Sequence, residues 1–245
     1  MSAAGWTASE MMTVAAARQL ADGEVCFVGI GMPSLAANLA RRTHAPGLVL
    51  VYESGTIGSK PQVVPLSIGD GELAETADAV VPVPEIFNYW LQPGRIDVGF
   101  LGAAEIDRRG DINTTVIGPY DAPRVRLPGA GGAPEIARSS GRVVVVVRQS
   151  PRTFVERVGF RTSRGERVAT VITDLGVLGR DADRGELVLA AVHPGRTVDE
   201  ARALLPGPRG SQDFPGAYRS ALVLFQSPMK SIEDSPMNSE VSPTC

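Results

Sequence analysis

The chain has 245 residues, which is enough for one large domain or two small ones. Hydrophobic residues make up 43% and charged residues 21%, as in an ordinary globular protein. The net charge of -3 gives no reason to expect nucleic acid or an anionic membrane surface as a partner. The sequence shows neither a secretory signal nor an apolar run that could cross a bilayer, so we expect a cytoplasmic protein that binds no membrane.

Cysteine and histidine give no indication of a metal centre or a disulfide framework. Cys26 lies inside an apolar run and is expected in the core, whereas Cys245 ends the chain and is expected to be exposed. His44 and His193 are far apart, and no cluster of His, Cys and acidic residues has metal-ligand spacing. We therefore predict no metal site.

Helices and strands are predicted to alternate along the chain. Thr7 and Glu10 have capping-box spacing and predict a first helix, and Thr197 and Glu200 predict a late one in the same way. Pro33 suits the first turn of a helix that continues to about Thr43. Apolar runs predict strands over residues 25–30, 48–53, 96–104, 143–147, 168–173 and 187–192.

This alternation predicts an α/β fold with an open, mainly parallel sheet and flanking helices. The strands after Val143 could add an antiparallel section, so a mixed sheet is also possible. Residues 1–205 are expected to form the folded domain. Residues 206–245 are rich in Pro and Ser and are predicted to be a disordered tail.

Glu53 stands out because it ends a buried strand and precedes glycines. The segment 55–58 is interpreted as the turn that ends this strand. Residues at the carboxyl ends of strands in open α/β sheets line the ligand crevice. A glutamate there is either an ionised anchor or a nucleophile.

Two glycine-rich segments could bring backbone amides to a ligand. Gly29 and Gly31 lie between a strand and a helix, which suits either a phosphate site or a plain tight turn. The third glycine of a dinucleotide fingerprint is missing, so an NAD site is weakly supported. The segment 129–133 could form an oxyanion hole or a surface linker.

Polar residues after the 96–104 strand can be explained by local structure without a catalytic role. Asp107 and Gly110 suit a turn, and Asn113 can hydrogen-bond to its own backbone. Glu105 and Asp107 would share one face of a strand without any need for catalysis. Lys60 is expected in a solvated loop rather than in Schiff-base chemistry.

Seven short motifs together resemble the β subunits of family I coenzyme A (CoA) transferases. The resemblance covers about residues 9–205 and implies a CoA-transferase-like fold. The Glu-Ser-Gly form, in place of Ser-Glu-Asn-Gly, resembles the glutaconate CoA-transferase β subunits and one branch of the 3-oxoadipate CoA-transferase β subunits. The motifs are Gly29-Ile30-Gly31-Met32-Pro33, Glu53-Ser54-Gly55, Gly102-Ala103-Ala104-Glu105-Ile106-Asp107, Asn113-Thr114-Thr115, Gly131-Gly132-Ala133, Thr173-Asp174-Leu175-Gly176-Val177 and His193-Pro194-Gly195-Arg196-Thr197.

The resemblance implies that Glu53 is a nucleophile, which attacks an acyl-CoA thioester and ends as a glutamyl-CoA thioester. It implies oxyanion and CoA contacts from Gly131, Gly132 and Ala133. It further implies that a second set of residues borders the CoA chain and that a third set of residues lies near the active site. The second set is Gly29, Ile30, Gly31, Met32 and Pro33, and the third is Ser54, Gly55, Glu105 and Asn113.

The family also implies CoA as a substrate, no permanently bound cofactor, and an α subunit that completes a hetero-oligomer. The predicted reaction moves CoA from succinyl-CoA to 3-oxoadipate in aromatic catabolism. Glutaconate or another dicarboxylate, a hydrolase of this fold and a CoA-binding subunit without chemistry are the alternatives. Glu105 and Asp111 stand where many relatives have amides, and their charges would disfavour a dicarboxylate if they lined the site.

Overall fold

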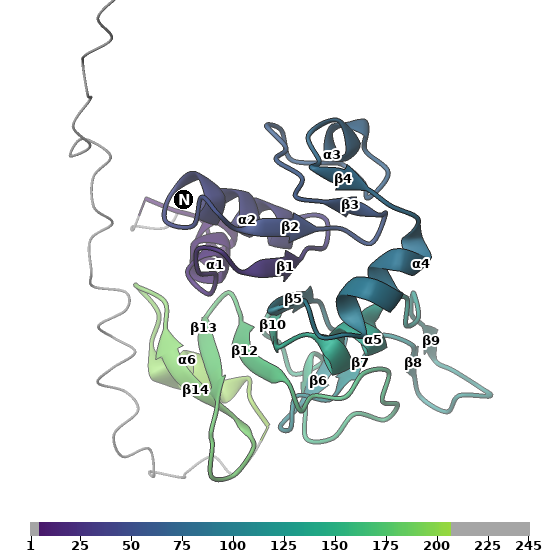
Figure 1. Cartoon of the computed structure of the whole chain (residues 1–245). Coiled ribbons are helices and arrows are strands. Elements are labelled where there is room, and N and C mark those ends of the chain that lie inside the picture. Colours follow the sequence, from purple (N-terminus) through teal and green to yellow (C-terminus); the bar gives the residue numbers. More distant parts are fainter. Residues whose placement is uncertain (1–4, 207–245) are drawn as a thin grey trace, which may run out of the picture. The chain divides into compact units, whose positions relative to one another are not determined.

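The computed structural model describes residues 5–206 (Figure 1). The predicted tail therefore lies outside the described residues except for Pro206, as does Cys245. Within the described part, one mixed sheet has nine strands in the order β14-β13-β12-β10-β5-β1-β2-β3-β4. The α/β fold class is confirmed, and the alternative of a mixed sheet is the correct one.

The centre of the sheet is parallel and both of its edges are antiparallel. The parallel strands are β2 Val49–Val51, β1 Val25–Phe27, β5 Val98–Leu101, β10 Arg142–Val146 and β12 Val168–Ile172. The antiparallel strands are β13 Gly176–Arg180 and β14 Leu187–Val192 on one side, and β3 Thr56–Ile57 and β4 Ala79–Val80 on the other. The carboxyl ends of the parallel strands therefore meet at one edge of the sheet.

The sheet differs from the sequence prediction at β3, β4 and β13, and β4 was not predicted. The segment 55–58 is not simply a turn, because Thr56 and Ile57 form β3, and Ile57 pairs with Val51. Strand β13 was not predicted, since its glycines weaken the strand pattern. Gly176 is needed there, because a Cβ atom at this position would overlap the carbonyl oxygen of Ala191 on the neighbouring strand.

The predicted helix starts are confirmed. Thr7 and Thr197 both form complete capping boxes, at α1 Ala8–Ala17 and α6 Val198–Ala203. Pro33 lies in the first turn of α2 Met32–Arg42. The remaining elements are α3 Gly71–Glu75, α4 Val83–Glu85, the π-helix η1 Ile86–Leu91, α5 Ala133–Ser139, β6 Glu105–Asp107, β7 Ile112–Asn113, β8 Val116–Ile117, β9 Val125–Arg126 and β11 Phe154–Val155.

Alternating residues of β5 face different layers. A Cβ atom on Gly99 would lie 2.5 Å from Ile136 Cγ2, so α5 packs directly on this strand. Phe100 points the other way, because successive side chains of a strand alternate. Cys26 is fully buried, as predicted. None of the helices described between residues 5 and 206 has the length and apolar character needed to span a bilayer.

Candidate active site

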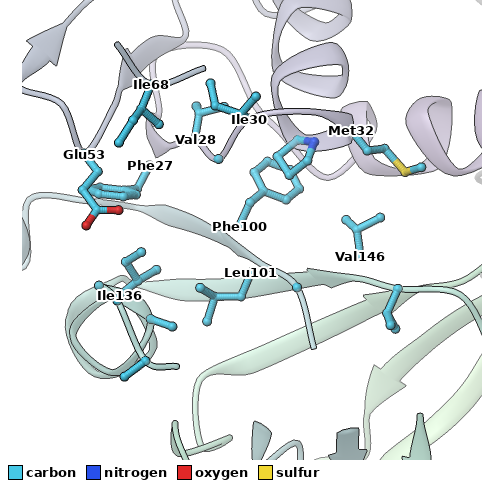
Figure 2. A pocket seen from close by; sticks show the side chains of 18 of the residues that line it. Phe27, Val28, Ile30, Met32, Glu53, Ile68, Phe100, Leu101, Ile136 and Val146 are labelled. Carbon is cyan, nitrogen blue, oxygen red and sulfur yellow. The ribbon is translucent and has the colours of Figure 1, made fainter. Parts of the chain in front are cut away.

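A cavity of about 520 Å³ lies at the carboxyl ends of four neighbouring parallel strands. Its lining includes Glu53 after β2, Gly29 after β1, Gly102 after β5 and Arg148 after β10. Figure 2 shows Glu53 on one side of this cavity, with Phe100 in the middle. This is the edge at which open α/β sheets bind ligands.

A tight turn after β2 presents the Glu53 side chain. The Gly55 amide donates to the Tyr52 carbonyl at 3.1 Å, and the Tyr52 amide donates to the Thr56 carbonyl at 3.0 Å. Gly55 has φ of 108°, and a Cβ atom there would overlap the carbonyl oxygen of Val81. Only glycine satisfies both conditions without strain. The chain therefore reverses within a few residues and leaves Glu53 at the bend.

Tyr52, at the start of this turn, is held by a contact with α2. Its ring is fully buried, and its hydroxyl lies 3.0 Å from Ser34 Oγ on α2. Burial raises the pKa of Tyr52, so the phenol stays protonated near neutral pH. The strand that carries Glu53 is thus tied to the helix that follows the first glycine segment.

The second glycine segment approaches Glu53 closely. Gly131, Gly132 and Ala133 all line the cavity, and Gly132 is the N-cap of α5. A Cβ atom on Gly132 would lie 3.4 Å from Glu53 Oε1. These three residues and Glu53 therefore line one cavity.

The first glycine segment forms another wall of the cavity. Gly29, Ile30, Met32 and Pro33 line it, whereas Gly31 does not. Gly31 is instead the N-cap of α2 with φ of 87°, a conformation that glycine adopts at little cost. Gly31 therefore shapes the turn rather than the surface of the cavity.

The predicted near-site residues do not line the cavity. Asn113 Nδ2 donates to Glu105 Oε2 at 2.7 Å, and Asn113 Oδ1 accepts from the Thr115 amide at 3.0 Å. This agrees with the simpler interpretation of Asn113 as a residue that bonds to its own backbone. Ser54 and Gly55 belong to the turn next to Glu53.

The Asn113 segment nevertheless supports the second glycine segment. Thr114 Oγ1 donates to the Gly129 carbonyl at 2.8 Å, and the Gly129 amide donates to the Thr114 carbonyl at 2.8 Å. These two bonds hold the start of the loop that reaches Gly132.

The other polar candidates have structural contacts. Asp107 Oδ1 accepts from the Arg109 and Asp111 amides at 3.0 and 3.1 Å, as expected for a turn. Asp111 Oδ1 accepts from the Gly165 amide at 2.8 Å. Lys60 pairs with Asp78 on the surface. Within residues 5–206, no group of His, Cys, Asp and Glu side chains could hold a metal ion.

Sequence reasoning missed several lining residues, among them Phe27, Ile68, Phe100 and Arg148. The aromatic residues gave no signal, because apolar residues inside strands are expected in a core. Arg148 could have been found, since it follows the predicted strand 143–147 as Glu53 follows its own strand. Among the lining residues of the described chain, Glu53 and Arg148 are the two with ionisable side chains.

The chain belongs to the coenzyme A transferase family, whose model matches residues 9–203. The β subunit of a 3-oxoadipate CoA-transferase from Pseudomonas knackmussii is 58% identical over 210 residues, which cover 80% of this chain and 81% of the relative. These matches confirm the resemblance to CoA-transferase β subunits, and the chain is a CoA-transferase subunit.

Two solved structures also match closely. The crystal structure of glutaconate coenzyme A-transferase from Acidaminococcus fermentans has a TM-score of 0.77 and 28% identity, and covers 83% of this chain and 86% of that one. The decarboxylase AibA/AibB has a TM-score of 0.74 and 31% identity, and covers 89% of this chain and 94% of that one.

Proposed function

We propose that this chain is the β subunit of a transferase that moves CoA from succinyl-CoA to 3-oxoadipate. The observation that carries this proposal is the approach of Glu53 to Gly132 inside one cavity. The 58% identity to the β subunit of a 3-oxoadipate CoA-transferase supports the choice of acceptor. An α subunit is the proposed partner, because the relative is itself a subunit. The cytoplasm stays the predicted location.

Glu53 is the proposed nucleophile. Its carboxylate attacks the succinyl thioester, and a mixed anhydride forms as CoA thiolate leaves. The thiolate then attacks the glutamyl carbonyl, which releases succinate and leaves a glutamyl-CoA thioester. The acceptor carboxylate attacks this thioester, and the released thiolate attacks the acceptor acyl carbonyl. Acyl-CoA leaves and the free Glu53 carboxylate returns.

The neighbouring groups suit the charge that develops in these steps. Each attack creates an oxyanion at a carbonyl, and backbone amides of Gly131 and Gly132 are the proposed donors to it. Such donors contribute about 3–4 kcal/mol each in other acyl-transfer sites. Gly29, Ile30, Met32 and Pro33 are proposed to border the CoA chain.

The acidic departures from the family do not weigh against a dicarboxylate acceptor. Neither Glu105 nor Asp111 lines the cavity of the described chain, and both carboxylates accept hydrogen bonds from neighbouring groups. A dicarboxylate would therefore meet mainly apolar walls and glycines. CoA enters the reaction as a substrate, and the mechanism uses no resident cofactor.

The decisive test is trapping of the glutamyl-CoA thioester. The complex with its α subunit is mixed with succinyl-CoA, reduced with borohydride, and measured by intact and peptide mass. Reduction of the thioester to an alcohol at Glu53 supports the proposal, and the Glu53→Gln complex should remain unmodified. Glu166→Gln is the matched control, because Glu166 is exposed and precedes the amino end of β12.

The same assay separates the alternatives. If succinyl-CoA is consumed without any acceptor and Glu53→Gln keeps that activity, the chain serves a hydrolase. The match to AibA/AibB makes decarboxylation a second candidate, which would release carbon dioxide with no transfer of CoA. If Glu53→Gln leaves transfer intact, the chemistry belongs to the partner.

A further inference from the structure

The cavity contains an ionisable residue that the proposed mechanism does not use. Arg148 lines the cavity together with apolar side chains and glycines. It is exposed, and its Nη2 donates to Ser9 Oγ at 3.3 Å. None of the ion pairs among residues 5–206 involves Arg148. A cation without a carboxylate partner in a cavity suits an anionic part of a ligand.

The sheet separates Arg148 from Glu53 by a defined distance. Arg148 follows β10 and Glu53 follows β2, and the strands between them are β5 and β1. In the register of these strands Val51 is level with Val143, so Arg148 lies three residues further along than Glu53. Three strand spacings of 4.7–4.9 Å and this offset of about 10 Å place the two backbone positions about 17 Å apart. Figure 2 shows Glu53 and Val146, the last residue of β10, on opposite sides of the cavity.

The Arg148 side chain does not reach toward Glu53, so its charge is no closer to Glu53 than its backbone is. Its guanidinium is turned toward Ser9 near the start of α1, a helix that packs against α2 as well as against β10 and β12. Strand β12 lies beyond β10 on the side away from β2. The positive charge therefore lies at the far end of the cavity.

The walls between the two ends are apolar. Figure 2 shows Phe100 between Glu53 and Val146 and Phe27 beside Glu53, and Met32 also lines the cavity. A ligand that spans them needs an uncharged middle section, a reactive group at the Glu53 end and an anion at the Arg148 end.

Coenzyme A has this form. Twelve covalent bonds separate the sulfur from the first phosphate-bearing oxygen, as many as four residues of backbone, which extend to about 14 Å. The diphosphate follows this oxygen and covers the remaining distance to Arg148. A succinyl group is a poorer match, because its two carboxyl carbons are three bonds and about 4 Å apart. The spacing therefore favours a phosphate of CoA over the distal carboxylate of the acyl group.

We propose that Arg148 binds the diphosphate of coenzyme A while the sulfur lies at Glu53. This inference rests on the proposed function. Guanidinium groups pair with phosphate oxygens through two parallel hydrogen bonds, which fix direction as well as affinity. Arg148 is thus a positioning residue that sets the direction of the CoA chain along the cavity, and it takes no part in the acyl chemistry.

The test compares two donors that differ in the diphosphate. The assembled complex transfers from succinyl-CoA or from succinyl-pantetheine, which lacks the nucleotide. Arg148→Gln should raise the KM for succinyl-CoA about three- to tenfold and leave the KM for succinyl-pantetheine unchanged. Arg148→Lys should recover part of the loss. Arg152→Gln removes the same charge from an exposed position outside the lining and should change neither value.

Each other outcome counts against the inference. An equal loss with both donors would mean that Arg148 acts on the acyl group or on the fold. An unchanged KM for succinyl-CoA would mean that the diphosphate lies elsewhere. Wild-type activity is measured first. A wild-type complex that transfers no CoA would reject the proposed function itself. An active wild type together with an Arg148→Gln variant of unchanged KM would reject the role of Arg148 alone.

Discussion

Glu53 Oε1 lies 3.4 Å from the point that a Cβ atom on Gly132 would occupy. The same point is 3.1 Å from Phe87 Cζ of the π-helix. Glycine at position 132 therefore keeps open the space beside the carboxylate. Gly132 has φ of -79° and ψ of -3°, which any residue can adopt, so the backbone conformation does not require glycine. Glycine is required because any side chain at this position would occupy the space between Glu53 and Phe87.

Gly132→Ala should accordingly lower kcat without unfolding the protein. The added methyl group would press on the Phe87 ring, at 3.1 and 3.2 Å, and would fill the space beside the Glu53 carboxylate that a reacting group needs. Displacement of a reacting group by about 1 Å can cost roughly 100-fold in rate. Steady-state transfer by the assembled complex gives the rate, and its melting curve gives the fold. Gly159→Ala is the control, because a Cβ atom there meets nothing within 4 Å. Full activity of Gly132→Ala would contradict the close contact.

Glu53→Asp tests whether the carboxylate must reach a defined point. The variant keeps the charge but withdraws it by one carbon–carbon bond, about 1.5 Å. We expect a loss of about 100-fold in kcat/KM, and a greater loss for Glu53→Gln, which has the length but no nucleophilic oxygen. Equal activities of the Asp and wild-type complexes would indicate a binding anchor. Glu166→Asp controls for the change in side-chain length at a remote exposed site.

Sequence patterns were most informative where local chemistry determines the structure. The capping boxes at Thr7 and Thr197 and the proline at the start of α2 are read from side chains a few residues apart. The position of Glu53 followed from one apolar run and the glycines after it. Strand β13 was missed because the neighbouring strand, which no local window includes, imposes the need for Gly176.

The composition of the cavity was harder to predict for the same reason. Phe100 and Arg148 come together with Glu53 only after four strands align in the order β10-β5-β1-β2. Pairing order is a long-range property, and a strand rich in valine gives no indication of its neighbours. Asn113 was predicted near the site, and its side-chain oxygen accepts from the Thr115 amide while the next residue, Thr114, holds Gly129.

Gly55→Ala should destabilise the turn that carries Glu53. The substitution adds a Cβ atom at φ of 108° and forces it into the carbonyl oxygen of Val81. Gly94→Ala is a matched control, because φ is 75° there and a Cβ atom meets nothing within 4 Å. Both variants should lose about 1–2 kcal/mol from backbone strain, and Gly55→Ala should lose more because of the overlap. Thermal unfolding of the two complexes measures the difference, and equal melting temperatures would show that the turn can relax.

Arg142→Gln should lower the free energy of unfolding near neutral pH. It should also make that free energy less sensitive to acid. Arg142 donates to both Glu24 oxygens at 2.6 and 2.8 Å, and these bonds lower the pKa of Glu24 below its ordinary value of 4.5. A lowered folded-state pKa stabilises the fold above the unfolded value, and this contribution is lost as pH falls through 4.5 toward the folded value. Because both side chains are partly exposed, we expect the variant to lose about 1 kcal/mol of unfolding free energy near neutral pH.

Urea unfolding between about pH 6 and pH 4 measures this dependence. The free energy of unfolding should fall less steeply with pH for the variant than for wild type. Arg164→Gln breaks an exposed pair with Glu166 and should follow the wild-type curve. Parallel curves for Arg142→Gln and wild type would assign the acid sensitivity to other groups.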